Sequence, residues 1–285
     1  MRSDVALSRR ALLAEATAAL SAAGVSEPRR EALRLWSELR GAPPAEVFLD
    51  GEAEAEPDAA AALRIAVRRR AAGEPLAHVA GRVGFRNLLL RSDHRALIPR
   101  PETEGLVDLL LARVRTGRAA DIGTGSGCLA LSLASEGAFA QVSAVDTSAE
   151  ALAQAEENRA ALGARVRLVR GDLCGPLRPG SLDAVVSNPP YLTDGEYAAL
   201  DRSVKRWEPA AALVSGPDGL HATNRLLHEA RVVLRAGGWL ALEVDCTRAA
   251  AVAAQAGALG WMDVAIHADL FGRERYLLAR RSAQP

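Results

Sequence analysis

The residues with the most distinctive chemistry form a short corner, SNPPYL, at positions 187–192. It follows the segment LDAVV at 182–186, which is apolar except for Asp183 and predicts a buried strand. Asn188 offers a side-chain carbonyl, and Pro189 offers a backbone carbonyl whose position is restricted by the proline ring. Two such acceptors can bind both N–H bonds of a planar amide or base and stabilise the positive charge that its nitrogen gains during methylation. Tyr191 can stack on the same planar group, so the corner indicates methyl transfer to nitrogen.

A glycine loop, DIGTGSG, lies earlier in the chain between a predicted strand and a predicted helix. Gly123, Gly125 and Gly127 let the backbone turn sharply and approach a ligand closely. The dinucleotide fingerprint is Gly-x-Gly-x-x-Gly. Here the third glycine comes one residue early, and Cys128 occupies its usual place. The tighter spacing favours a ligand without a pyrophosphate, such as S-adenosylmethionine.

Acidic residues at the ends of strands are consistent with such a ligand. Asp146 follows the next predicted strand, where a carboxylate can accept hydrogen bonds from both ribose hydroxyls. Asp172 follows the third strand and could accept from an adenine amino group, while Leu173 could pack on the ring. Asp121 lies near the expected methionine end and could attract its ammonium group. The order of these residues predicts a nucleoside-containing cofactor.

Alternating strands and helices must position these groups. Strands are predicted at 119–122, 141–145, 166–170, 182–187 and 239–244, with helices between them such as 149–162 and 221–234. This alternation predicts an α/β fold with a parallel sheet, whose ligands lie beyond the carboxyl ends of the strands. The glycine loop and Asn188 should therefore face one crevice. The segment 262–281 predicts an antiparallel hairpin that turns at Gly272.

The chain before the sheet has a helical pattern. Residues 1–76 predict a small helical domain, 77–98 a linker with a short strand pair, and 99–285 the catalytic domain. In one helix, at 26–41, Ser26 is predicted to be the N-cap, Pro28 lies in the first turn and Gly41 ends the helix.

Composition narrows the classes of partner. The 285 residues include 35 basic and 35 acidic side chains, so no overall charge favours nucleic acid or a membrane surface. The 3 cysteines are far apart, which favours a reducing compartment, and no Cys or His spacing is typical of a metal site. No apolar run reaches the roughly 18 residues of a membrane span. We expect a cytoplasmic monomer that binds no metal, no membrane and no nucleic acid directly.

Several of these motifs resemble one family. GEPLAHVAG, LIPRPETEGLVD, DIGTGSGCLALSLA, AVDTS, SNPPYL and WEPAAAL are similar to segments of the peptide chain release factor glutamine methyltransferases, PrmC/HemK. The resemblance implies a class I S-adenosylmethionine-dependent methyltransferase fold, with a Rossmann-like seven-stranded sheet and a small all-helical N-terminal domain that helps dock the substrate. It implies methylation of the glutamine amide nitrogen in the Gly-Gly-Gln motif of class 1 release factors, which act in translation termination.

The resemblance also implies residue roles. With Asp172 added from the strand pattern, the expected cofactor contacts are Gly123, Thr124, Gly125, Ser126, Gly127, Asp146, Asp172, Leu173 and Asn188. The expected glutamine contacts are Asn188, Pro189, Pro190 and Tyr191, of which Asn188, Pro189 and Tyr191 are the expected catalytic residues. The loop at 99–104 is expected to close over the site.

Three other functions share parts of this pattern. A nucleic-acid amino-methyltransferase, acting on adenine N6 or guanine N2, uses the same corner on a flipped base. Zero net charge and the lack of a basic, aromatic-interleaved module disfavour it. A ribosomal-protein glutamine methyltransferase is a related protein-directed alternative. A non-catalytic cofactor-binding adaptor is disfavoured because it has no use for the amide acceptors of the corner.

Overall fold

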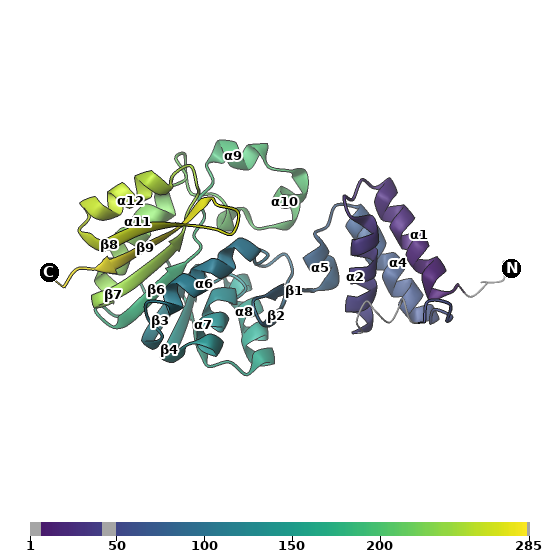
Figure 1. Ribbon diagram of the computed structural model, residues 1–285, viewed down its shortest axis with the longest axis horizontal. Coiled ribbons are helices and arrows are strands. Elements are labelled where there is room, and N and C mark those ends of the chain that lie inside the picture. The colour runs from purple at the N-terminus through teal and green to yellow at the C-terminus, as the bar shows by residue number, and fades with distance from the viewer. Residues whose placement is uncertain (1–6, 42–49, 284–285) are drawn as a thin grey trace. The chain divides into compact units, whose positions relative to one another are not determined.

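The computed structural model describes residues 7–41 and 50–283, and its backbone forms two compact units (Figure 1). The first unit is Met1–Arg82 and the second is Val83–Pro285. The boundary between them falls inside the range for which the sequence predicts a linker. Each unit has its own buried apolar core.

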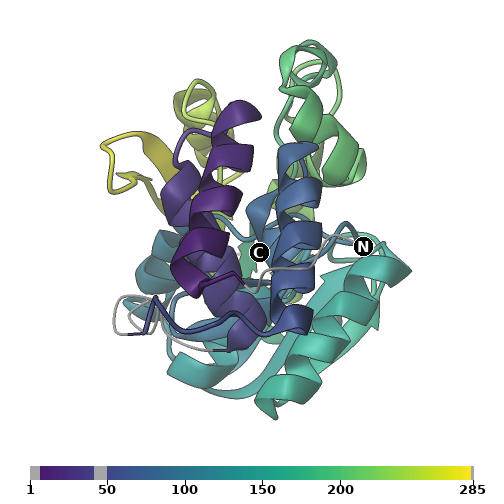
Figure 2. The ribbon, with the colours of Figure 1, turned by 90° about the vertical axis from the view of Figure 1, so that its right-hand side faces the viewer.

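The N-terminal unit is helical. Its helices are α1 (Arg9–Ala22), α2 (Pro28–Arg40), α4 (Pro57–Ala71) and the short α5 (Leu76–Ala80). The first three pack against one another, as Figure 2 shows for the purple and blue helices. Their contact surfaces bury an apolar cluster that includes Leu12, Leu35, Trp36 and Leu63. This unit therefore has the all-helical character that the sequence predicts.

The start of α2 differs from its prediction. The N-cap is Glu27, whose side chain makes no capping hydrogen bond, so the expectation that Ser26 caps this helix is wrong. A residue before proline is disfavoured in the helical region, and Glu27 has φ −121° and ψ 59°. The helix therefore begins at Pro28 itself. Its end is as predicted, because Gly41 adopts the left-handed conformation with φ 64°.

The second unit contains a seven-stranded sheet in the order β5-β4-β3-β6-β7-β9-β8, which confirms the predicted fold class. The strands are β3 (Thr116–Ile122), β4 (Ala138–Asp146), β5 (Val166–Arg170), β6 (Leu182–Ser187), β7 (Leu234–Glu243), β8 (Trp261–Ala268) and β9 (Glu274–Arg281). The first five in chain order are parallel, and β9 pairs antiparallel with both β7 and β8. The hairpin predicted at Gly272 is confirmed. Two further strands, β1 (Arg82–Phe85) and β2 (Leu88–Arg91), form a separate two-stranded sheet where a strand pair is predicted.

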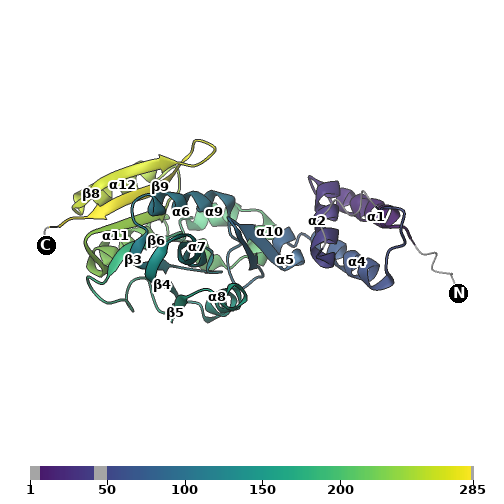
Figure 3. The same cartoon turned by 60° about the horizontal axis from the view of Figure 1, so that its bottom comes forward.

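Helices cover both faces of the large sheet (Figure 3). The longer ones are α6 (Glu104–Leu111), α7 (Cys128–Glu136), α8 (Ala149–Leu162), α11 (His221–Val233) and α12 (Ala249–Ala258). The shorter ones are η1 (Pro101–Thr103), α9 (Asp194–Ala199), α10 (Arg202–Trp207) and η2 (Ala210–Ala212). Along β6, Val185 joins the core cluster under α11 and α12, whereas Ala184 and Val186 join the cluster under α6 and α7. Because every residue of β6 is buried, the strand leads a fully enclosed backbone to the polar corner that follows it.

Candidate functional site

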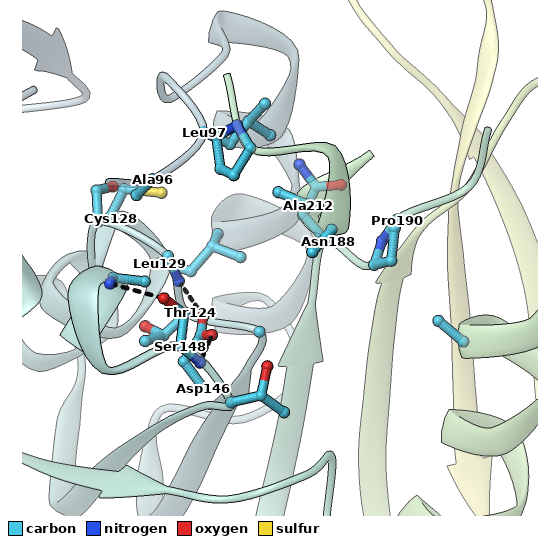
Figure 4. A pocket seen from close by; sticks show the side chains of 18 of the residues that line it. Ala96, Leu97, Thr124, Cys128, Leu129, Asp146, Ser148, Asn188, Pro190 and Ala212 are labelled. Carbon is cyan, nitrogen blue, oxygen red and sulfur yellow. Dashed lines mark hydrogen bonds between the residues drawn. The ribbon is translucent and has the colours of Figure 1, made fainter. Parts of the chain in front are cut away.

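A pocket with a volume of about 320 Å³ lies where the parallel strands end (Figure 4). The segments after β3, β4, β5 and β6 all contribute to its wall. Of the residues predicted for the site, those that line it are Gly123, Thr124, Gly125, Ser126, Asp146, Asp172, Leu173, Asn188 and Pro190. Gly127, Pro189 and Tyr191 are not among the lining residues. The topology of the sheet thus brings together groups from four separate loops.

The glycine loop has a left-handed backbone at all of its glycines. The φ angles of Gly123, Gly125 and Gly127 are 71°, 53° and 87°, a region that side chains with a Cβ rarely adopt. At Gly127 space is also limited, because an added Cβ would lie 3.2 Å from Leu131 Cδ1 and 3.4 Å from Ala155 Cβ. Gly127 therefore sets the close packing of α7 against α8, while the residues before it face the pocket.

Asp146 is held in a defined orientation at the end of β4. Its Oδ2 accepts a hydrogen bond from the Gly125 N–H at 2.9 Å, and its Oδ1 accepts from the Ser148 N–H at 2.9 Å (Figure 4). Ser148 is also the N-cap of α8, since its hydroxyl accepts from the Ala151 N–H. Each carboxylate oxygen retains a further lone pair. The Asp146 carboxylate can therefore accept from two neighbouring hydroxyl groups in the pocket.

Asp172 and Leu173 form the rim of the pocket after β5. Asp172 Oδ2 pairs with Arg225 Nη2 at 2.9 Å, and both side chains are substantially exposed. Leu173 has φ 44°, a left-handed conformation that costs free energy in a residue with a branched side chain. Its side chain packs against the core under α11 while it lines the pocket. The surrounding structure thus maintains a strained backbone at a ligand-facing position.

Asp121 lies beneath the glycine loop instead of on the pocket wall. Its side chain is fully buried, and Oδ2 accepts from the Thr124 hydroxyl at 2.6 Å and from the Ala130 N–H at 3.0 Å. Burial raises the pKa of Asp121 to about 7. In this structure Asp121 supports the loop and is not among the residues that line the pocket.

The corner after β6 is anchored from several directions. The Ser187 hydroxyl donates to the Ile122 carbonyl at 2.6 Å, which joins the ends of β6 and β3. The Asn188 side chain donates through Nδ2 to Thr103 Oγ1 at 3.1 Å, and Thr103 donates to Glu243 Oε2 at 2.7 Å. Beyond the corner, Leu192 pairs through its backbone with the segment around Val214. Burial raises the pKa of Tyr191 to about 12, which keeps its phenol neutral.

Sequence reasoning missed part of the pocket wall. Two further segments line it, 95–98 and a second one that contributes Pro209, Ala211 and Ala212, together with His221, Ala222 and Arg225. The first segment is held by Glu208, whose buried carboxylate accepts from Arg100 Nη2 at 2.6 Å and 2.9 Å and from the Ile98 N–H at 3.3 Å. The sequence signal that could have indicated this contact is a pair of opposite charges, Arg100 in LIPRPETEGLVD and Glu208 in WEPAAAL. Their pairing over more than a hundred residues is a property of the folded chain.

The loop predicted to close over the site is fixed on its other side by β9. The Tyr276 hydroxyl donates to the Glu102 carbonyl, and an added Cβ at Gly105 would lie 2.7 Å from that hydroxyl. Gly105 thus permits the close approach of Tyr276. Pro99, Arg100 and Thr103 from this loop line the pocket. In residues 7–41 and 50–283, no cluster of His, Cys, Asp and Glu could hold a metal ion, and no helix has the length and apolar character of a membrane span.

Family models match both units. A Methyltransferase small domain matches residues 101–207, and a PrmC N-terminal domain matches residues 11–81. A solved structure described as a methyltransferase from Pyrococcus furiosus shares the fold, with a TM-score of 0.53 and 22% identity over 70% of this chain and 91% of that chain.

Curated relatives match nearly the whole length. A release factor glutamine methyltransferase of Deinococcus radiodurans is 43% identical, covering 96% of this chain and 98% of the relative. A protein of the same name from Cereibacter sphaeroides is 40% identical, covering 93% of this chain and 95% of the relative. With the pocket, the corner and the N-terminal helical unit all present, the chain belongs to the release factor glutamine methyltransferase family.

Proposed function

We propose that this chain transfers a methyl group from S-adenosylmethionine to the N5 side-chain amide of the glutamine in the Gly-Gly-Gln motif of class 1 peptide chain release factors. The names and coverage of the relatives support this substrate. The structural observation that carries the proposal is Asn188, a half-buried amide at the pocket wall whose NH₂ group donates a hydrogen bond to Thr103. An amide held in this way offers its oxygen to a planar N–H donor.

The pocket fits the proposed cofactor, which supplies the methyl group when bound. The oriented Asp146 carboxylate suits the two hydroxyls of a ribose. Asp172 and Leu173 are assigned to the adenine amino group and ring, and the residues assigned to the methionine end are Gly123, Thr124, Gly125, Ser126 and Gly127. Gly127 acts there through the packing of α7, because it does not line the pocket.

The corner is assigned to the glutamine amide. Asn188 Oδ1 and the Pro189 carbonyl are assigned to its two N–H bonds, and Tyr191 is assigned to its plane. Of the corner residues, Asn188 and Pro190 line the pocket, whereas Pro189 and Tyr191 do not. As the nitrogen is alkylated its positive charge increases, and the two fixed acceptors become stronger partners for its protons. The corner needs no general base, since an N-protonated amide is strongly acidic and loses its proton to water.

We assign release-factor docking to residues 1–76, joined through 77–98 to the catalytic domain at 99–285. The enzyme is proposed to act as a cytoplasmic monomer that contacts no nucleic acid directly and no membrane.

The test is transfer of a radiolabelled methyl group to purified, unmethylated release factor. A Gly-Gly-Ala variant of the factor, total RNA and ribosomal proteins are the controls. We expect label only on the factor with the intact glutamine. Label on RNA or on a ribosomal protein would keep the chemistry of the corner and overturn the substrate. Cofactor binding without transfer to any acceptor would instead support an adaptor.

A further inference from the structure

Behind the corner, three side chains from distant segments form a hydrogen-bonded series. Asn188 follows β6, Thr103 lies in η1, and Glu243 ends β7. The distances are 3.1 Å from Asn188 Nδ2 to Thr103 Oγ1 and 2.7 Å from Thr103 Oγ1 to Glu243 Oε2. Thr103 and Glu243 are each 2% exposed, so water does not compete for the hydrogen bond between them.

The number of hydrogens in this series decides which way the Asn188 amide faces. A threonine hydroxyl has one hydrogen to donate, and a carboxylate can only accept. When Glu243 is ionised, the Thr103 hydrogen is therefore directed to Glu243, and Thr103 can only accept from Asn188. The Asn188 NH₂ group must face Thr103, which leaves Oδ1 as the amide atom available to a ligand.

The opposite orientation would be unfavourable for the proposed reaction. A rotated Asn188 would present its NH₂ group to the N–H bonds of the acceptor amide. Two N–H donors would then face each other. The positive charge that develops on the methylated nitrogen would also lie next to the positive end of the Asn188 amide dipole. An unfixed asparagine would sample both orientations, because its two terminal groups are nearly equal in size.

We propose that Glu243, acting through Thr103, is a positioning residue that fixes the oxygen of the Asn188 amide toward the methyl acceptor. This inference rests on the function proposed above for Asn188. Glu243 does not line the pocket, and Thr103 lines it with only a small exposed fraction of its surface. Glu243 therefore acts on catalysis through the polarity of a hydrogen-bonded series and not through contact with substrate.

The surroundings of Glu243 make the donor–acceptor direction of the Glu243–Thr103–Asn188 hydrogen bonds sensitive to pH. Burial raises the pKa of Glu243 above its ordinary value. Arg275 of β9 lies 3.9 Å from Oε1. The other charged or titratable groups that influence this region are Arg100, Glu102, Cys128, Tyr191, Asp245 and Tyr276. A protonated Glu243 would donate to Thr103, Thr103 would donate to Asn188, and the amide would rotate. The rate should therefore fall as pH decreases through the raised pKa of Glu243.

The test uses Thr103→Val, Thr103→Ser and Glu243→Gln in the full-length enzyme with release factor as substrate. We expect Thr103→Val and Glu243→Gln each to lower kcat by roughly 10- to 100-fold. This effect is smaller than that of removing the Asn188 side chain, because the charge-stabilising amide is still present. Thr103→Ser should keep kcat within about threefold, because it retains the hydroxyl. The acidic decline of kcat should be present in the wild type and absent in Glu243→Gln, whose side chain does not titrate.

A matched control is Asp183→Asn, which neutralises a buried carboxylate at the other end of β6. It should lower thermal stability without changing kcat or its pH profile. The dissociation constant for S-adenosylmethionine, measured by calorimetry, should stay within about twofold in the Thr103 and Glu243 variants. In labelled enzyme, one Asn188 side-chain N–H should exchange slowly with solvent, and that protection should disappear in Thr103→Val.

The outcomes separate this inference from the proposed function. If the wild type methylates the factor and Asn188→Ala does not, wild-type kcat in Thr103→Val and Glu243→Gln would overturn the positioning role alone. If Thr103→Ser lost as much activity as Thr103→Val, the role of the hydroxyl would be rejected as well. An active Asn188→Ala enzyme would remove the basis of both proposals.

Discussion

The two halves of the pocket are built in different ways. On the cofactor side, Asp146 is held by N–H groups of Gly125 and Ser148, which lie in the loops directly after β3 and β4. On the acceptor side, Asn188 is held by Thr103, and Thr103 by Glu243, across sequence separations of 85 and 140 residues. The first half depends on backbone N–H groups that lie 21 and 2 residues from Asp146 in the sequence. The second half depends on buried side chains that meet only when the sheet is assembled.

This difference implies that substitutions in one half should affect cofactor affinity and substitutions in the other half should affect the rate of methyl transfer. Backbone N–H groups remain in place when a side chain is removed, so the cofactor half should lose affinity gradually. A buried side-chain series has no substitute for a missing member, so the acceptor half should lose rate steeply.

The largest expected effect is that of Asn188→Ala. It removes the oxygen that stabilises charge on the acceptor, so kcat should fall by about a thousandfold. The dissociation constant for S-adenosylmethionine should change little, because most of its proposed contacts lie on the other half. Calorimetry and single-turnover methyl transfer would measure the two quantities. Near-normal turnover would contradict the role of the corner.

The next effect is expected for Arg100→Ala, which leaves the buried Glu208 carboxylate with the Ile98 N–H as its remaining partner. Removing one member of a buried pair costs about 3–5 kcal/mol, and partial exposure of Arg100 reduces this to about 2 kcal/mol. Urea denaturation would measure the loss. Arg115→Ala, at an exposed arginine away from the pocket, is the control. Because the loop at 95–103 contributes to both halves, this variant should impair cofactor binding and rate together.

A smaller and more selective effect is expected for Asp146→Ala. Loss of charged hydrogen bonds to the ribose should weaken S-adenosylmethionine binding by about 1–3 kcal/mol. At saturating cofactor, kcat should recover most of its wild-type value, which distinguishes this variant from Asn188→Ala. An unchanged dissociation constant would exclude Asp146 from the cofactor site.

The smallest effect is expected for Ser148→Ala. It removes the N-cap of α8 and should lower the free energy of unfolding by about 1 kcal/mol. The Ser148 N–H that donates to Asp146 remains, so cofactor affinity should change less than in Asp146→Ala. A loss of affinity equal to that of Asp146→Ala would show that the cofactor half also depends on side-chain positioning.

Prediction from sequence was most accurate where a segment's own residues decide its structure. The bounds predicted for β5, β6 and α8 agree with the structure, since apolar runs and a serine N-cap mark them. The prediction for β7 began five residues late, at Trp239 instead of Leu234. The glycines at 237 and 238 are typical of a turn, yet pairing with β6, through a register shift, keeps this segment in the strand. Likewise, α11 ends at Val233 because Leu234 begins β7.

The sequence by itself determined the order of strands and helices along the chain, the left-handed glycine loop, the acidic residue at the end of β4 and the position of the corner. These features depend on local backbone preference and on the alternation of apolar and polar residues. Tertiary structure decided that Glu243 and Glu208 are buried partners of Thr103 and Arg100, and that Asp121 supports the loop instead of lining the pocket. A carboxylate's environment depends on which distant groups the fold brings to it, and no local pattern encodes that burial.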